Sequence, residues 1–153
     1  MKIEIVEATE KDKEFVLLAN KKIDECSFVE KSALKENIDK DLFREKRCVC
    51  LIAKVGNENV GMILFSKVYW ADRGDGIYVS QGYVEKPYRK NGVFKKMLVE
   101  AAKYYPKTNF ATCLVSNKNQ NMIDCMHNLS FEDEDMISYV KNKNELLKIL
   151  EED

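Results

Sequence analysis

Apolar and charged residues alternate near the amino end of the chain, over residues 2–8 (Lys-Ile-Glu-Ile-Val-Glu-Ala). Alternation with a period of two is typical of a half-buried strand, so we expect a strand there. Thr9 and Asp12 then resemble a capping box, which predicts the start of a helix. Apolar residues recur after it at helical spacing, at Phe15, Leu18, Ala19, Ile23 and Cys26. A strand followed by a helix therefore opens the chain.

A second apolar stripe, Leu34, Ile38 and Leu42, has charged residues between its members and predicts a second helix. Strand-like segments follow at about 47–55, 60–70 and 76–85, separated by turn-forming residues. Those turns are Gly56-Asn57 and the polar run 72–76 (Asp-Arg-Gly-Asp-Gly). Because turns this short join antiparallel neighbours, we expect three antiparallel strands.

The run from Tyr88 to Leu98, Tyr-Arg-Lys-Asn-Gly-Val-Phe-Lys-Lys-Met-Leu, follows the last of these strands and opens into an amphipathic helix. The first turn of a helix has backbone N–H groups without intrahelical partners and partial positive charge, so it suits an anion. Gly92 lets the backbone approach a ligand closely, and Arg89 and Lys90 add positive charge. These residues predict a pyrophosphate site. A plain surface loop before a solvated basic helix is the alternative.

The remaining pattern completes a mixed fold. Phe110 to Val115 is a short apolar strand, parallel to the strand before the Gly92 helix because a helix connects the two. Asn117 or Asn119 starts another helix through about Leu129, followed by strand-like Met136 to Val140. The predicted order is βααβββαβαβ, an α/β (α+β) fold with a mixed, mostly antiparallel twisted sheet flanked by helices.

Composition narrows the class of protein. With 153 residues and 45% hydrophobic side chains, we expect one domain spanning residues 1–153. The 25 basic and 26 acidic residues balance, so global charge favours neither a nucleic-acid nor a membrane partner. Charged residues interrupt the amino terminus, and the chain has no apolar run of 18 residues, so we expect a cytoplasmic protein.

Five cysteines lie at positions 26, 48, 50, 113 and 125, without a CxxC pair, and the chain has one histidine. That spacing favours reduced thiols over a disulfide framework or a zinc site, and we expect no metal. Cys125 and His127 could form a nucleophilic pair, but residues two apart on a helix point in different directions.

The Gly92 loop and its flanks resemble the acetyl-CoA signature of the GCN5-related N-acetyltransferases. Arg89, Gly92 and Phe94 stand at the three defined places of that signature, with Phe94 in place of a small residue. The resemblance implies an acyl-CoA N-acyltransferase domain that uses acetyl-CoA (coenzyme A) as co-substrate, without a metal. The cofactor-binding residues that it implies are Val84, Arg89, Lys90, Asn91, Gly92, Val93, Phe94 and Asn119.

The segment from Leu114 to Phe131 is similar to a second part of the family pattern. Asn119 and Phe131 match it, whereas Met126 stands where the family has a tyrosine and Ser130 replaces a glycine. The tyrosine is the family's general acid for the departing thiolate. Methionine cannot donate a proton, so this role falls to water or to a neighbouring side chain such as Cys125, His127 or Ser130.

The reaction implied by the resemblance needs a neutral amine, whereas a lysine-type amine with a pKa near about 10.4 is protonated at neutral pH. Glu85, at the end of a strand beside Val84, is the candidate base; a solvated charge is the alternative.

Two functions follow from the resemblance: an N-acetyltransferase that works by direct attack of a primary amine, or a catalytically weak or inactive acyl-CoA-binding regulatory module. The acceptor is a small-molecule or peptide amine, and Asp72, Asp75 and Glu85 hint at a cationic one. The region 130–140 and the apolar tail around Leu146 either close the core or form a homodimer contact.

Overall fold

The computed structural model describes residues 1–27, 33–135, 138 and 142–148. Its centre is a five-stranded sheet in the order β1-β2-β3-β4-β5. The strands are β1 (Glu4–Glu7), β2 (Val49–Val55), β3 (Glu58–Trp70), β4 (Gly74–Val84) and β5 (Phe110–Cys113). The first four are antiparallel neighbours, and β5 runs parallel to β4. The predicted mixed, mostly antiparallel sheet is confirmed.

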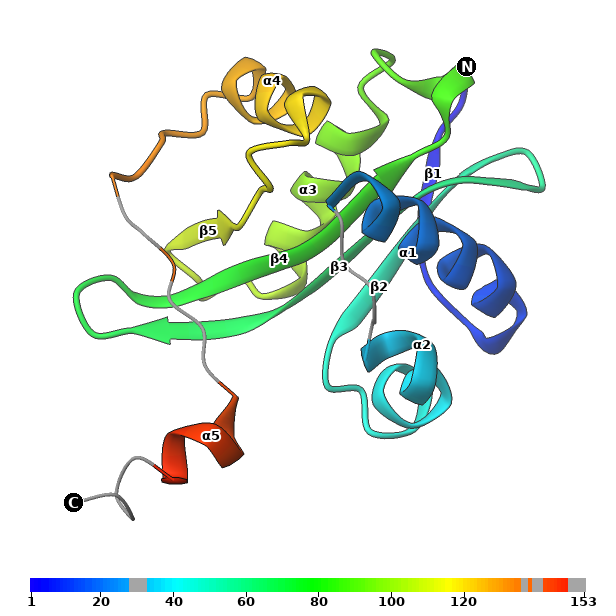
Figure 1. The fold of residues 1–153 in the computed structure, drawn as a ribbon. Helices are drawn as coiled ribbons and strands as arrows, with labels where there is room; N and C mark the ends of the chain where they lie inside the picture. The colour runs from blue at the N-terminus through cyan, green and yellow to red at the C-terminus, as the bar shows by residue number, and fades with distance from the viewer. Residues whose placement is uncertain (28–32, 136–137, 139–141, 149–153) are drawn as a thin grey trace.

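Helices cover both faces of this sheet (Figure 1). α1 (Lys13–Ser27) and α2 (Ala33–Ile38) lie over one face, where Val16, Ile52 and Met62 share a buried cluster. α3 (Val93–Tyr104) covers the other face, where Met97 packs with Phe65. Strand residues alternate between the two clusters because successive side chains of a strand point to opposite faces.

The buried side of α1 agrees with the predicted stripe in part. Ala19 is buried as predicted, and Phe15 and Ile23 pack against the buried cluster, whereas Leu18 is 45% exposed and Cys26 is exposed. Val16 and Asn20, which lie outside the predicted stripe, are also buried. The run Phe-Val-Leu-Leu-Ala at 15–19 is apolar at every position, so its spacing alone does not fix which side of the helix meets the sheet.

The second predicted helix is divided in two. Asn37 has the non-helical angles φ −128° and ψ 19°, and a π-helix, Asp39–Arg44, follows α2. Its wider turn is closed by the Glu45 N–H, which donates to the Lys40 carbonyl oxygen at 2.7 Å. Ile38 and Leu42 are buried, as their stripe predicted, because a spacing of four residues keeps them on one side in either kind of helix.

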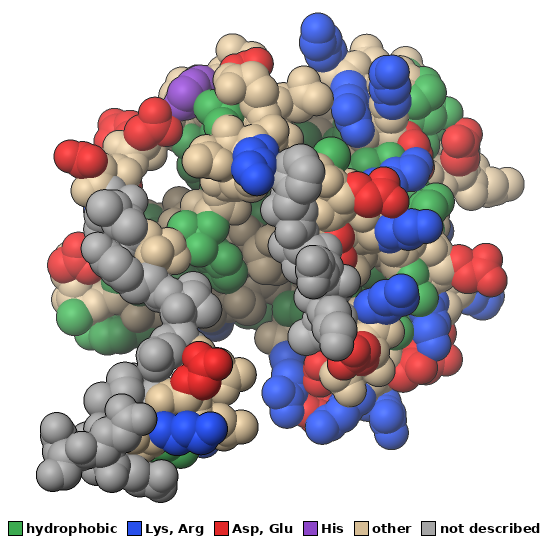
Figure 2. Space-filling view, viewed as in Figure 1, with side chains coloured by type: hydrophobic (Ala, Val, Ile, Leu, Met, Phe, Trp, Pro, Cys, Tyr) green, Lys and Arg blue, Asp and Glu red, His purple; other side chains and the backbone are tan. Residues whose placement is uncertain are grey.

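The carboxyl-terminal part contains α4 (Gln120–Asn128) and α5 (Lys143–Lys148). The strand predicted at Met136 to Val140 falls largely outside the described residues; within it, Ser138 is described and has no regular structure. Among the described helices, none has the length and apolar character needed to cross a membrane. On the face drawn in Figure 2, Lys and Arg side chains intermingle with Asp and Glu.

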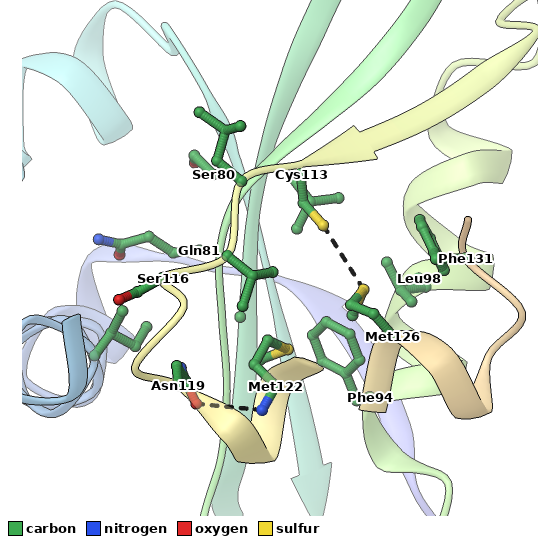
Figure 3. Close-up of a pocket in the computed structure, with 15 residues that line it drawn as sticks. Ser80, Gln81, Phe94, Leu98, Cys113, Ser116, Asn119, Met122, Met126 and Phe131 are labelled. Atoms are coloured by element: carbon green, nitrogen blue, oxygen red, sulfur yellow. Dashed lines mark hydrogen bonds between the residues drawn. The ribbon is translucent and has the colours of Figure 1, made fainter. Parts of the chain in front are cut away.

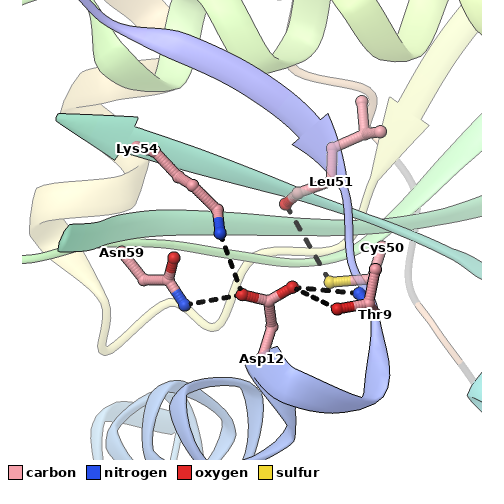
Figure 4. Close-up of polar contacts among 6 residues, drawn as sticks. All are labelled: Thr9, Asp12, Cys50, Leu51, Lys54 and Asn59. Atoms are coloured by element: carbon pink, nitrogen blue, oxygen red, sulfur yellow. Dashed lines mark hydrogen bonds and ion pairs between the residues drawn. The ribbon is translucent and has the colours of Figure 1, made fainter. Parts of the chain in front are cut away.

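A buried carboxylate joins the start of the first helical segment to the sheet (Figure 4). Asp12 ends a 3₁₀ turn, Glu10–Asp12, and accepts hydrogen bonds from the Thr9 N–H at 2.9 Å and the Asn59 amide at 2.9 Å. The Lys54 ammonium lies 3.3 Å from the same carboxylate. Burial raises the pKa of Asp12, but these partners outweigh it, and the net pKa lies below the ordinary value of 3.8.

Candidate active site

The sheet opens between β4 and β5. Leu64 pairs with Gln81 and Phe65 with Val79, so Ser80 is an extra, bulged residue in β4. β5 pairs with β4 only up to Cys113, opposite Val79. The bulge and the end of the pairing fall at the same point, and beyond it the two strands part.

A cleft lies where they part (Figure 3). Its empty volume is about 570 Å³, counting the part that is open to solvent. It is lined by residues from five segments: Val79, Ser80, Gln81 and Gly82 of β4; Cys113, Leu114, Val115 and Ser116 at the end of β5; Phe94 and Leu98 of α3; Asn119, Met122, Met126 and Phe131 around α4; and Ile23 of α1. The lining is largely apolar, with a few polar groups, as in many ligand sites.

Glycines let α3 approach the sheet closely. A Cβ on Gly82 would lie 2.3 Å from Phe94 Cε2, and one on Gly61 would lie 3.1 Å from Met97 Cε. The Phe94 side chain therefore packs on the sheet and lines the cleft, which leaves its backbone at the first turn of the helix. A large residue is accommodated at this place because its ring points inward.

The loop before α3 has a left-handed backbone at two residues, Lys90 with φ 63° and Gly92 with φ 74°. Gly92 is the N-cap of α3, and its carbonyl oxygen accepts the first helical hydrogen bond from the Lys96 N–H at 3.0 Å. Within the described part of the chain, the N–H groups of Val93, Phe94 and Lys95 have no backbone or side-chain acceptor. Free N–H groups at a helix start can hold a phosphate.

Arg89 ties this loop to the end of β4. Its Nε donates to the Val84 carbonyl oxygen at 2.9 Å, and its guanidinium carbon lies 5.8 Å from the centre of the Tyr83 ring. The contact fixes the loop relative to the strand and leaves the other guanidinium nitrogens available for a ligand.

α4 is capped at both ends. The Asn119 side chain accepts a hydrogen bond from the Met122 N–H at 3.2 Å, so this asparagine, rather than Asn117, starts the helix. At the other end the Phe131 N–H donates to the Met126 carbonyl oxygen and the Ser130 N–H to that of His127. This is a Schellman motif, with Ser130 at φ 61°. A glycine is favoured at such a position, and Ser130 occupies it at a cost.

Met126 is buried at the cleft and lies against Cys113, whose Sγ is 3.7 Å from Met126 Sδ. Burial raises the pKa of the Cys113 thiol above its ordinary value. Cys125 is half-buried, also with a raised pKa, and His127 Nε2 lies 3.0 Å from an Asp133 carboxylate oxygen. Among the described contacts of Cys125 and His127, none joins these two residues to each other.

Glu85 follows β4 on the side of the sheet that α1 covers. Its carboxylate lies 3.3 Å from Lys22 Nζ and accepts a hydrogen bond from the Tyr83 hydroxyl at 3.1 Å. About a fifth of the Glu85 side chain, 22%, is accessible to solvent. Glu85 is close in sequence to the cleft residues of β4 but does not line the cleft itself. Its charged partner is the Lys22 ammonium.

The structure therefore distributes the predicted residues over three regions. Phe94 and Asn119 line the cleft, residues 89–93 form the loop and helix start that lead to it, and Val84 and Glu85 lie at the end of β4. Sequence reasoning missed Ser80 and Gln81, since a bulge shows only once the pairing with β3 is known. The described residues contain no group of three His, Cys, Asp or Glu side chains placed to hold a metal ion.

Several solved structures that resemble this chain are described as acetyltransferases. A possible acetyltransferase from Clostridium difficile 630 superposes with a TM-score of 0.74, at 21% identity over 93% of this chain and 98% of that one. A predicted acetyltransferase with acetyl-CoA from Clostridium acetobutylicum has a TM-score of 0.71, at 15% identity over 96% and 98%. An aminoglycoside acetyltransferase from an uncultured soil metagenomic sample, in complex with sisomicin, has a TM-score of 0.70, at 14% identity over 92% and 97%.

No curated protein matches the sequence. The model of the acetyltransferase (GNAT) family, however, matches residues 16–131. This segment contains the whole sheet except β1, together with the Gly92 loop, α3 and α4. Because the match spans most of the chain and agrees with the fold, the chain belongs to the GNAT family of acetyltransferases.

Proposed function

We propose that this protein is an N-acetyltransferase that transfers the acetyl group of acetyl-CoA to a primary amine. The observation that carries the proposal is the cleft at the β4 bulge, which lies next to a helix start with free N–H groups. The acetyl-CoA bound to the Clostridium acetobutylicum structure supports it.

The cleft and the Gly92 loop beside it fit two parts of acetyl-CoA, its pyrophosphate and its pantetheine chain. The Gly92 loop, the N–H groups of Val93 and Phe94, and Arg89 and Lys90 would hold the pyrophosphate. Beyond Val79, no described strand pairs with the edge of β4 that faces away from β3, so the backbone groups of this edge can bond to an extended chain such as pantetheine. Asn119 would help to close the site from the α4 side.

Acetyl-CoA supplies an activated thioester carbonyl when bound. The amine nitrogen forms a bond to the carbonyl carbon, the carbon–sulfur bond breaks, and the thiolate leaves with its electron pair. One proton leaves the nitrogen. The protein contributes by holding the amine and the carbonyl in reacting geometry and by presenting backbone N–H groups to the carbonyl oxygen. Glu85 is our candidate for the group that takes the proton.

The acceptor is a small-molecule or peptide amine. Sisomicin in the metagenomic relative is a precedent for the former. Asp72 is paired with Arg73, and Asp75 pairs with Tyr69 at the same β3–β4 hairpin. Of the acidic residues that hint at a cationic acceptor, Glu85 is the one at the other end of β4, beyond the bulge. The five cysteines are free thiols, which fits the cytoplasmic location that we expect.

An acyl-CoA-binding regulatory module is the second candidate, and Met126 is the observation in its favour. A thioether cannot protonate a leaving thiolate, and the nearby Cys113 has a raised pKa. A thiolate is, however, a good leaving group that can depart into water, so turnover does not require a tyrosine.

Thermal unfolding with CoA and acetyl-CoA tests the proposal. A ligand that binds only the native state at about 100 times its Kd adds roughly 2.7 kcal/mol of stability. Gly92→Glu places bulk and negative charge at the phosphate end and should abolish the shift, whereas Gly92→Asn, which tolerates a left-handed backbone, should retain most of it.

Acetyl-CoA turnover against a panel of amines then separates the two candidates. An acetyltransferase releases CoA in proportion to the acetylated amine, and a regulatory module binds acetyl-CoA without turnover. A wild-type melting curve that millimolar acetyl-CoA leaves unchanged would contradict both.

A further inference from the structure

Gln81 carries a buried acceptor that nothing in the described part of the chain satisfies. Its Oε1 is inaccessible to solvent and receives no hydrogen bond from a described residue. A buried polar atom without a partner is destabilising, and such atoms are rare in folded proteins. Asn20 Nδ2 and Asn59 Oδ1 are in the same state, but Gln81 is the one of these three residues that lines the cleft.

The alternation of side chains along β4 places the Gln81 side chain on the face of the sheet that α1 covers. Gly82 faces Phe94 and α3, so its neighbours Gln81 and Tyr83 face the opposite way, and Tyr83 is buried in the cluster under α1. Figure 3 shows Gln81 directed away from Phe94 and Met126. Ile23 of α1 lines the same cleft. The cleft therefore reaches both faces of the sheet through the gap between β4 and β5.

This arrangement separates the two substrates. The Gly92 loop and α3 lie on one face and would hold the CoA donor, as proposed above. An acceptor then approaches the thioester from the α1 face, where Gln81 stands one residue beyond the bulge.

We propose that the Gln81 side chain turns toward the cleft when the acceptor binds, so that its Oε1, buried in this structure, accepts a hydrogen bond from an N–H of the attacking amine and orients it; the inference rests on the proposed acetyl transfer. A carboxamide oxygen is an acceptor but does not take the proton, so its role is orientation rather than base catalysis. A neutral primary amine has two N–H bonds: one gives up its proton during the reaction, and the other stays on the nitrogen of the product amide, where Gln81 can hold it throughout. A secondary amine has one N–H and an alcohol one O–H, so neither can donate to Gln81 and release its proton at the same time. Gln81 therefore favours primary amines.

The test uses two stable analogues that need no knowledge of the natural acceptor. CoA-S-CH₂-CO-NH-CH₃ carries the N–H of the product amide, and CoA-S-CH₂-CO-O-CH₃ replaces it with oxygen. Calorimetry should show that the wild type binds the amide about tenfold more tightly, in line with the penalty for an unpaired buried acceptor. Gln81→Met should bind both analogues equally, and Gln81→Glu, which keeps an oxygen, should retain the preference.

Asn20→Leu is the matched control. Asn20 also carries a buried amide atom without a described partner, Nδ2, but it does not line the cleft. This variant should keep the tenfold preference, and CoA alone should bind all the variants equally, which shows that the donor site is intact. If Gln81→Met does not fold, Gln81→Leu replaces it.

Equal wild-type affinity for the two analogues, or a preference that persists in both Gln81→Met and Gln81→Leu, would overturn the role of Gln81 and leave the proposed function standing. Failure of the wild type to bind CoA would instead remove the proposed function and this inference with it.

Discussion

The ring of Phe94 occupies the space that a side chain at Gly82 would need, because a Cβ there would lie 2.3 Å from Phe94 Cε2. This contact brings the first turn of α3 against β4 at the cleft. It also explains how the loop signature tolerates a phenylalanine where a small residue is usual: the strand supplies the small residue instead.

Gly82→Ala should therefore destabilise the fold and disturb the cleft together. Forcing a methyl group into this packing costs roughly 1–3 kcal/mol, because the buried ring must leave its place. Phe94 also lines the cleft, so we expect CoA affinity to fall at least tenfold. Urea unfolding and calorimetric titration with CoA measure the two effects.

The double variant Gly82→Ala with Phe94→Leu provides the control, since a smaller side chain at 94 makes room for the methyl group. Its stability should exceed that of Gly82→Ala alone. Independent, additive effects of the two substitutions would show that the contact is not energetically coupled.

Asp12 should make stability depend on pH. Its pKa is lower in the folded chain than the ordinary 3.8, so the ionised form is favoured by folding. The sign follows: the contribution is complete above 3.8 and is lost as the pH falls below 3.8 through the lower folded pKa. Asp12→Asn should lose about 1–3 kcal/mol at pH 7, because Thr9, Asn59 and Lys54 all present donors to it.

Asp39→Asn is the matched control, because the Asp39 pair with Lys13 is exposed, with 58% of the Asp39 side chain accessible. Exposed pairs contribute little, so this change should stay within about 0.5 kcal/mol. Urea unfolding at pH 7, 5 and 3 should show the difference between wild type and Asp12→Asn shrinking at the lowest pH. A constant difference would assign the loss to packing rather than to charge.

Ser130→Gly should stabilise the protein. Ser130 holds a left-handed backbone, φ 61°, at the end of α4, and glycine adopts that conformation without the steric cost of a Cβ. The entropy that glycine adds to the unfolded chain offsets part of the gain, which leaves about 0.5–1 kcal/mol. For a chain of this length that is a rise in Tm of roughly 1–4 °C by calorimetry. A lower Tm would mean that the serine makes a compensating contact.

The sequence predicted those parts of the site that depend on local chemistry. Gly92, with its positive φ, and the apolar rows of α3 are recognisable because a turn and a helix are determined by neighbouring residues. Asn119 as a helix cap belongs to the same class. The cleft was not predicted, because it arises where Ser80 interrupts the pairing with β3 and where β5 leaves β4.

The same distinction, between features set by neighbouring residues and features set by tertiary contacts, explains where the helix predictions were wrong. Leu18 and Val16 are equally apolar, so only packing against the sheet decides that Val16 is buried. Ile38 and Leu42 keep their shared side whether the turn is α or π, so their spacing did not reveal the π-helix. Tertiary contacts determine both features.

The ion pair between Glu85 and Lys22 allows the role of Glu85 to be tested. If Glu85 is the base, Glu85→Gln should lower turnover by about 10²-fold or more and leave acetyl-CoA affinity unchanged, because the amide cannot accept the proton. Lys22→Met removes the same ion pair but keeps the carboxylate and its bond from the Tyr83 hydroxyl, so turnover should hold or rise. Steady-state rates from pH 6 to 10 for both variants measure this, with wild-type turnover climbing as the amine loses its proton. Equal losses in the two variants would show that Glu85 only anchors α1 to β4 and would exclude it as the base, without affecting the CoA site.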